Sequence, residues 1–325
     1  MRRRLLGVTS VPLAVAVLLI GGERALGASV SGPPASLLVQ VSTLSSFTPA
    51  TVDGWLASIC VDRRPKTIAL QDVATPDGAL ATPYLDVIVK YLPGGSRPCF
   101  NRAFIGTVDL TWTGTGSMYS DGVQDNEFRG RYLSLSQSVA RAFRSRYPQV
   151  RAGWYLSYEA NLNELFYPAV QNAYKTLLSS EIQLLNAIRP GQVMWSPAFW
   201  YPYSAYSQNA VGMSQLRTML TDLFTTVKVQ FLDLQDYVGG SACQPAWNRV
   251  TASDAASWAG FLGSLGRLSG IEVNSELYAP DCLRGGIGPG DAQEIASRRA
   301  FYASRGLTLG PAFELRYWIQ TRPTV

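Results

Sequence analysis

Apolar residues along the chain fall into short β-rich runs that alternate with longer segments of helical spacing. Apolar runs bounded by turn residues are typical of strands, and apolar positions three and four residues apart are typical of helices. The predicted strands are 36–42, 66–73, 103–112, 152–159, 192–199, 229–236, 270–277 and 307–315. The predicted helices are 134–147, 169–188, 214–227, 253–268 and 291–304, and the last three begin at the capping residues Ser214, Ser253 and Asp291.

The order of these elements predicts an α/β fold, a single (β/α)8 TIM barrel over residues 36–325. Strands that alternate with helices form parallel sheets, because parallel neighbours need a crossover connection. An open doubly wound sheet is the alternative architecture. Its nucleotide-binding form is disfavoured, since no Gly-x-Gly-x-x-Gly turn follows a predicted strand.

Residues 1–27 have the pattern of a signal peptide, and residues 28–35 form a linker after it. The positive segment Arg2–Arg4 precedes an apolar run over 5–20, and Ala25-Leu26-Gly27 is a small-residue cleavage site. The apolar run is short for a membrane-spanning helix. We therefore expect a secreted or periplasmic protein with no membrane contact beyond this segment. An uncleaved N-terminal anchor is the alternative.

Composition narrows the chemistry that this chain can perform. Its 325 residues include 28 lysines and arginines and 23 aspartates and glutamates, a net charge of +5. Without residues 1–27, 24 cations and 22 anions remain, and a net charge of +2 does not indicate a nucleic-acid partner. Histidine is absent, which excludes Ser-His-Asp and Cys-His nucleophile systems. We expect carboxylates to perform any acid–base step, with no cofactor and no bound metal.

The four cysteines are Cys60, Cys99, Cys243 and Cys282. An even number of cysteines in an exported protein predicts two disulfides, for which three pairings are possible. A zinc site is disfavoured, because the chain has no Cys-x-x-Cys pair and no histidine. In a barrel, the helix expected after the first strand ends at Cys60 and the third strand begins after Cys99, so both cysteines lie at the bottom. Cys243 and Cys282 follow strands six and seven and lie at the top. We therefore predict the pairs Cys60–Cys99 and Cys243–Cys282, since a disulfide cannot join opposite ends of a barrel.

Polar and aromatic residues gather where the predicted strands end. A barrel carries its active site at the C-terminal ends of its strands. Aromatic rings stack on the C–H faces of sugars while carboxylates and amides bond the hydroxyls, so this mixture favours a carbohydrate partner. The expected substrate-binding residues are Gln71, Asp72, Asp109, Trp112, Tyr158, Asn161, Ser196, Phe199, Trp200, Gln235, Asp236, Tyr237, Asn274 and Tyr317.

Two glutamates at the rim are the candidate catalytic pair. Glu159 follows the fourth apolar run and Glu276 the seventh, so they face each other across an eight-stranded barrel. Glycoside hydrolysis needs such a pair of carboxyl groups. We expect Glu159 to be the acid/base with the higher pKa and Glu276 the nucleophile of a retaining mechanism. Glu272 comes four residues earlier, deep in the barrel, and is interpreted as structural.

The segments at the strand ends resemble the domain of unknown function 4434 family, a group of glycosidase-like TIM barrels. The segments that carry the resemblance are Gly153-Trp154-Tyr155-Leu156-Ser157-Tyr158-Glu159, Ser196-Pro197-Ala198-Phe199, Asp233-Leu234-Gln235-Asp236-Tyr237-Val238-Gly239, Asn274-Ser275-Glu276-Leu277-Tyr278 and Phe313-Glu314-Leu315-Arg316-Tyr317. They span strands four to eight, about half the chain. The resemblance implies the barrel fold, and large glycosidase barrels place the acid/base after strand four and the nucleophile after strand seven. Those barrels have Asn before the acid/base, whereas this chain has Tyr158.

Three functions are compatible with these observations. The first is an exported glycoside hydrolase that acts on a cell-surface or extracellular polysaccharide. The second is a carbohydrate-binding barrel without catalysis that helps to handle a polysaccharide. The third is a metal-dependent hydrolase with Asp72, Asp109, Asp233 and Asp236 as oxygen ligands, which is disfavoured because no tight Asp-x-Asp loop is present. The sequence does not predict the sugar, the linkage or the oligomeric state.

Overall fold

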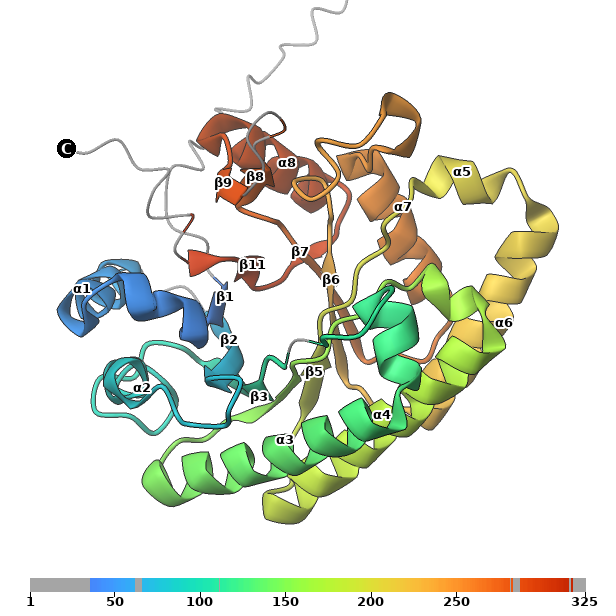
Figure 1. Ribbon diagram of the computed structural model, residues 1–325. Coiled ribbons are helices and arrows are strands. Elements are labelled where there is room, and N and C mark those ends of the chain that lie inside the picture. The colour runs from blue at the N-terminus through green and yellow to red at the C-terminus, as the bar shows by residue number, and fades with distance from the viewer. Residues whose placement is uncertain are drawn as a thin grey trace, which may run out of the picture. The chain divides into compact units, whose positions relative to one another are not determined.

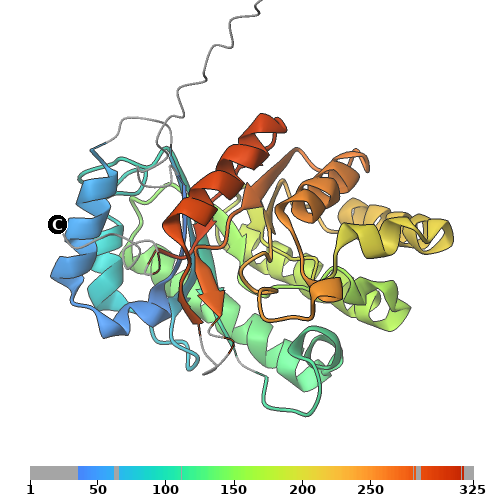
Figure 2. The same ribbon diagram turned by 90° about the horizontal axis from the view of Figure 1, so that it is seen from above.

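A parallel sheet wraps around a central axis and carries its helices on the outside (Figures 1 and 2). The computed structural model describes residues 36–61, 66–110, 112–280, 282, 287–315 and 317. The nine-stranded sheet has the order β10-β7-β6-β5-β4-β3-β2-β1-β11. The eighth barrel position is divided, because β10 pairs with β7 and β11, just after it in the chain, pairs with β1. The predicted barrel is thereby confirmed as a sheet that is nearly closed.

The elements have the following bounds. The barrel strands are β1 (Leu37–Gln40), β2 (Thr67–Ala74), β3 (Arg102–Val108), β4 (Gly153–Leu156), β5 (Val193–Trp195), β6 (Phe231–Gln235), β7 (Gly270–Asn274), β10 (Thr308–Leu309) and β11 (Ala312–Phe313), and β8 (Tyr278–Pro280) with β9 (Ile287–Pro289) forms an antiparallel hairpin. The helices are α1 (Pro49–Ile59), α2 (Thr82–Ile88), α3 (Asn126–Arg146), α4 (Pro168–Ile188), α5 (Tyr203–Ser207), α6 (Ala210–Thr226), α7 (Ala252–Gly263) and α8 (Ala292–Ser304). Short helical turns are η1 (Val41–Ser46), η2 (Met118–Gly122), η3 (Glu164–Phe166) and η4 (Ala246–Asn248).

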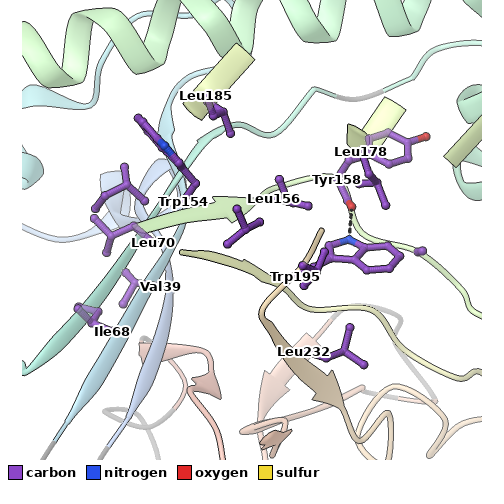
Figure 3. Packing of buried hydrophobic residues seen from close by; sticks show 14 of the residues in the cluster. Val39, Ile68, Leu70, Trp154, Leu156, Tyr158, Leu178, Leu185, Trp195 and Leu232 are labelled. Atoms are coloured by element: carbon purple, nitrogen blue, oxygen red, sulfur yellow. Dashed lines mark hydrogen bonds between the residues drawn. The ribbon is translucent and has the colours of Figure 1, made fainter. Parts of the chain in front are cut away.

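Successive residues of each strand face the helices and the barrel interior in turn, as the two-residue period of a strand requires. On β4, Trp154 and Leu156 join the outer core beneath α4, where Leu178 and Leu185 lie (Figure 3). Tyr155, between them, belongs to the small inner cluster that fills the barrel. The other fully buried members of that inner cluster are Leu38, Ala69, Phe104 and Met194. Burial of a side chain the size of Leu, Phe or Met contributes about 1.5–3 kcal/mol of transfer free energy.

Several predicted boundaries are wrong, and local hydrogen bonds give the reason. α6 begins after Asn209, whose side chain accepts from Gly212 N, and α7 begins after Thr251, which forms a capping box with Asp254. Ser214 and Ser253 therefore lie inside helices instead of capping them. Asp291 is confirmed as the cap of α8, because its carboxylate accepts from Glu294 N at 2.7 Å.

Both predicted disulfides are confirmed. Cys60 pairs with Cys99 with a Cα–Cα distance of 5.7 Å, and Cys243 pairs with Cys282 with a Cα–Cα distance of 5.3 Å. Disulfides of this kind are typical of proteins from oxidising compartments. The predicted signal peptide (1–27), the linker (28–35) and Arg316 lie outside the described residues. Among the residues that are described, no helix has the length and apolar character needed to cross a membrane.

Candidate active site

The C-terminal ends of β2, β4 and β6 bring three predicted site residues into contact. Glu159 Oε1 accepts hydrogen bonds from Gln71 Nε2 and from Gln235 Nε2, both at 2.8 Å. The strand period explains the meeting, because Glu159 shares the inward face of Tyr155, and Gln235 shares that of Asp233. Gln71 is buried, whereas Glu159 and Gln235 keep part of their surface exposed. These three side chains form what we call the Glu159 cluster.

The Glu159 cluster changes the acidity of the glutamate. Burial raises the pKa of Glu159, the nearby carboxylate of Asp109 adds to this effect, and the two amide hydrogen bonds oppose it, with a net pKa of about 7. Burial also raises the pKa of Asp109, which is partly exposed. Because Oε1 already accepts two N–H groups, Oε2 is the oxygen left to carry the proton. A carboxyl group that is half protonated near neutral pH suits a general acid.

Glu276 lies in a different environment. Its Oε2 accepts from the backbone N–H of Gly240 at 2.8 Å, and its Oε1 accepts from the Tyr278 hydroxyl at 3.1 Å. The residue is 0% exposed. Burial raises the pKa of Glu276, and the neighbouring carboxylate of Asp236 raises it further. The pKa of Glu276 is raised at least as far as that of Glu159, which corrects the expectation that Glu159 has the higher value.

Tyr278 connects the two glutamates electrostatically. Burial raises the pKa of its hydroxyl, and the negative charges of Glu276 and Glu159 add to that effect. Both glutamates therefore lie close enough to act on one tyrosine. Tyr278 is not among the predicted site residues, although it follows Glu276 by only two residues, because it is placed by the hairpin of β8 and β9, which has no strong strand pattern.

An aromatic group lies beside the glutamates. Trp200 stacks on Tyr237 with ring centroids 5.5 Å apart and an interplanar angle of 7°, and Tyr119 meets Trp200 edge-on at 4.9 Å. All three rings are partly exposed. Burial raises the pKa of Tyr119, and the charges of Glu159 and Asp109 add to it. Trp200 and Tyr237 are predicted site residues, whereas Tyr119 is not, because it lies in the turn η2, beyond the end of a strand.

Other predicted site residues are engaged by neighbouring protein groups, mostly through hydrogen bonds. Asp72 accepts from the backbone and the hydroxyl of Ser42, and burial raises the pKa of Asp72 to about 6. Asn274 donates to Asp233 at 3.0 Å and accepts from Phe313 N at 2.9 Å. Ser196 Oγ donates to the carbonyl oxygen of Asp233, and Asn161 Oδ1 accepts from the backbone N–H of Asn163. The ring of Tyr317 packs against the ring of Tyr278.

Three predicted aromatic residues lie away from the Glu159 cluster. The Tyr158 ring packs outward against Phe128, Tyr132 and Tyr174, because the residue beside an inward-facing position faces the helices. Its hydroxyl donates to Met118 O. Phe199 is buried in a 3.8 Å stack with Trp258. Trp112 lies past the end of β3, with its ring N–H 3.4 Å from Asp125.

Three of the four aspartates proposed as metal ligands, Asp72, Asp233 and Asp236, are bonded to other side chains, and Asp109 is partly exposed. Asp236 forms a buried ion pair with Arg298 at 3.1 Å, and Asp233 accepts from Asn274. Within the described parts of the chain, no three acidic or cysteine side chains gather as a metal site would require. Glu272 pairs with Arg102 at the first residue of β3, as its interpretation as a structural residue predicts.

Comparison with solved structures identifies the fold. No known family model and no curated protein matches the chain in sequence. In structure it resembles a putative α-L-fucosidase from Bacteroides thetaiotaomicron VPI-5482, with a TM-score of 0.57, 12% identity and coverage of 86% of this chain and 84% of that one. A GH18 chitinase from Pseudoalteromonas aurantia has a TM-score of 0.48 at 13% identity, with coverage of 88% and 99%. The intracellular xylanase TsXylA of Thermoanaerobacterium saccharolyticum JW/SL-YS485 has a TM-score of 0.46 at 13% identity, with coverage of 86% and 84%.

The likeness to the α-L-fucosidase, with its TM-score above 0.5, covers 86% of this chain. It supports the barrel fold that the strand order shows. At such low identity, the likeness carries the fold and not the reaction.

Proposed function

We propose that the protein is an exported glycoside hydrolase that cleaves O-glycosidic bonds in a cell-surface or extracellular polysaccharide. The observation that carries this proposal is the Glu159 cluster: a partly exposed glutamate at the barrel rim, held by two amides, with a pKa near 7. The two disulfides support export. Membership of the domain of unknown function 4434 family remains part of the proposal.

In the proposed mechanism, Glu159 is the general acid and Glu276 the nucleophile. Gln71 and Gln235 hold Oε1 of Glu159, so Oε2 donates its proton to the glycosidic oxygen while the bond from that oxygen to the anomeric carbon breaks. A Glu276 oxygen forms a bond to the same carbon. Water then attacks this carbon, Glu159 takes the proton of the water, and Glu276 is released. A retaining pair of this kind works with its carboxyl groups about 5–5.5 Å apart.

The mechanism requires Glu276 to become accessible. Gly240 and the Tyr278 hydroxyl cover both of its oxygens. A sugar therefore reaches Glu276 only when the turn at residues 237–241 or the Tyr278 side chain moves aside. That movement also lets water approach the carboxylate, which reverses the main cause of its raised pKa and favours the ionised nucleophile.

The complete burial of Glu276 favours a second candidate function, a carbohydrate-binding barrel without catalysis. A carboxyl group with both oxygens engaged and its pKa raised is what a structural role produces. In that case Trp200, Tyr237 and the Glu159 cluster bind sugar and no bond breaks. The two functions differ in turnover and not in binding.

The decisive experiment measures release of reducing sugar from a panel of polysaccharides by the protein without residues 1–27. We expect Glu159→Gln to lower turnover by about 10²–10⁴-fold, with the smallest loss on substrates with a good leaving group, which need little protonation. Glu181→Gln is the matched control, because Glu181 is also a buried glutamate with a raised pKa but contacts Tyr132 in the helical layer. Binding without turnover by the unmodified protein would establish the binding barrel instead.

The stereochemical outcome tests the roles within the pair. Proton NMR of the anomer first released from a defined substrate should show retention of configuration, and Glu276→Gln should abolish nearly all activity. Inversion, or an active Glu276→Gln protein, would refute the assignment of Glu276 as nucleophile.

A further inference from the structure

The backbone of Glu276 is held from outside the barrel by helix α8. Arg298 Nη2 donates to the carbonyl oxygen of Glu276 at 2.6 Å. The amide N–H of Glu276 donates to Asp236 Oδ1 at 3.2 Å. Arg298 Nη1 lies 3.2 Å from the same Asp236 oxygen, so one guanidinium and one carboxylate secure both sides of the residue.

The same helix contributes a second group. Tyr302 lies one turn after Arg298, and its hydroxyl donates to Asp236 Oδ2 at 2.9 Å. Asp236 also accepts from Val238 N at 3.4 Å, which ties the start of the turn over Glu276 into the same network. Arg298, Asp236 and Tyr302 are all buried. We call these three residues the α8 clamp.

We propose that Arg298 is a positioning residue for Glu276: through the α8 clamp it fixes the place of the carboxylate, and its positive charge favours the anion. The catalytic meaning of this inference rests on the proposed function, because it assumes that Glu276 is the nucleophile. The effect of the Arg298 charge on the ionisation of Glu276 does not depend on the proposed function. A cation buried beside two carboxylates must act on their ionisation whether or not a sugar is cleaved.

Five ionisable groups from four elements face Glu276. Asp236 lies after β6, Tyr237 is in the covering turn, Tyr278 is on β8, and Arg298 and Tyr302 are on α8. Of these five, only Arg298 carries a positive charge. The Nε atom of Arg298 also lies 3.5 Å from the exposed Glu294, which completes its ionic surroundings. Among these five groups, removing the guanidinium leaves Asp236 and Glu276 side by side without a positive charge.

A merely structural role for Arg298 makes a different prediction. If the arginine only attached α8 to the barrel, its replacement would lower stability and leave the ionisation of Glu276 unchanged. Arg144 provides the matched control for that role. It donates to two backbone carbonyls, Val150 O at 2.8 Å and Ala152 O at 2.9 Å, just before β4. It therefore joins α3 to the barrel far from the glutamate pair.

The test is a carbon NMR titration of protein with ¹³C-labelled glutamate and aspartate carboxyl groups. Glu276→Gln and Asp236→Asn assign the two resonances. Because the two groups are neighbours, they titrate as a pair with two apparent pKa values. We expect Arg298→Met to raise the upper value by about 1 to 3 pH units, Arg298→Lys to raise it less, and Arg144→Met to leave it unchanged. An unchanged value in Arg298→Met would overturn the inference.

Folding and function are separated by two further measurements. Should Arg298→Met fail to fold, Arg298→Gln removes the charge but keeps a side-chain N–H for the Glu276 carbonyl oxygen, and an unchanged upper pKa in Arg298→Gln overturns the proposal equally. Where the protein hydrolyses a substrate, the acidic limb of the kcat/KM profile should rise with the NMR value while KM changes little. A protein inert on every substrate refutes the proposed function, yet the titration still decides the role of Arg298.

Discussion

Glu181 on α4 offers a test of the buried electrostatics that does not depend on catalysis. The residue is completely buried, and its carboxylate accepts a hydrogen bond from the Tyr132 hydroxyl of α3 at 2.9 Å. Burial raises the pKa of Glu181 to about 8, although hydrogen bonds from Tyr132 and Ser136 lower it in part. In the unfolded chain the same group titrates near its ordinary value of 4.5. The folded protein therefore binds this proton more tightly than the unfolded chain does.

The sign of the effect follows from that difference. Below about pH 4.5 the group is neutral in both states and costs nothing. As pH rises toward the folded-state pKa, the unfolded chain gains from ionisation and the folded protein does not, so stability falls by about 1.4 kcal/mol per pH unit. Glu181→Gln removes the titration and keeps an acceptor for Tyr132. Its free energy of unfolding relative to the unmodified protein should therefore rise by about 3 kcal/mol between about pH 5 and about pH 7.

The assay is urea unfolding followed by tryptophan fluorescence at several pH values, with disulfides intact. Asp72, Glu159 and Glu276 also have raised pKa values, but they are present in both proteins and cancel in the difference. The slopes with denaturant should match, so that the midpoints alone change. A difference between the two proteins that stays constant with pH would refute the reasoning, because it would mean that Glu181 ionises in the folded state as easily as in the unfolded chain.

Two further predictions concern the site. If Glu159 is the general acid, kcat at saturating substrate, with the uncovered Glu276 ionised, should fall about tenfold per pH unit above about pH 7, and Asp109→Asn should move this basic limb to lower pH, since Asp109 raises the pKa of Glu159; a limb unmoved in the Asp109→Asn profile contradicts this. The two disulfides have the same sequence separation of 39 residues, so replacing either pair by serine should cost about 4 kcal/mol of chain entropy. Only loss of Cys243–Cys282, three residues after Gly240, should also lower kcat in still-folded protein, and equal kcat in the two double-serine variants would show that this disulfide does not support the turn over Glu276.

Most of the barrel is readable from the sequence because its strands are continuous apolar runs between helices. The strand ends are not, because side chains replace backbone partners there. Ser157 illustrates this, since its hydroxyl accepts from Thr107 N at 2.9 Å, just past the last residue of β4. The predicted strand over 152–159 therefore ends at Leu156. The start of α7 was readable, since Thr251 and Asp254 have the spacing of a capping box.

The candidate site, too, is predictable from the sequence only where local strand periodicity places its residues. The period of two places Glu159 and Gln235 on inward faces, and this much is local information. Tyr119 and Arg298 belong to the surroundings of the glutamates through tertiary packing, from a turn and a helix whose sequences have no such signal. Tyr158 shows the reverse case: it is adjacent to Glu159 in sequence yet faces the opposite layer. Neighbours along a strand are therefore poor guides to neighbours in a barrel site.

The two glutamates differ in what donates to them, and this difference bears on their roles. Neutral side-chain amides hold Glu159, and they do not offset burial and Asp109, so the proton is retained near neutral pH. A backbone N–H, a tyrosine hydroxyl and the nearby Arg298 charge act on Glu276, and all three lower its pKa against burial and Asp236. Burial is the one opposing influence that movement of the covering turn can remove. In the proposed mechanism, uncovering Glu276 exchanges the Gly240 and Tyr278 donors for water and removes the burial that disfavours the anion, whereas the Glu159 cluster needs no rearrangement to hold its proton.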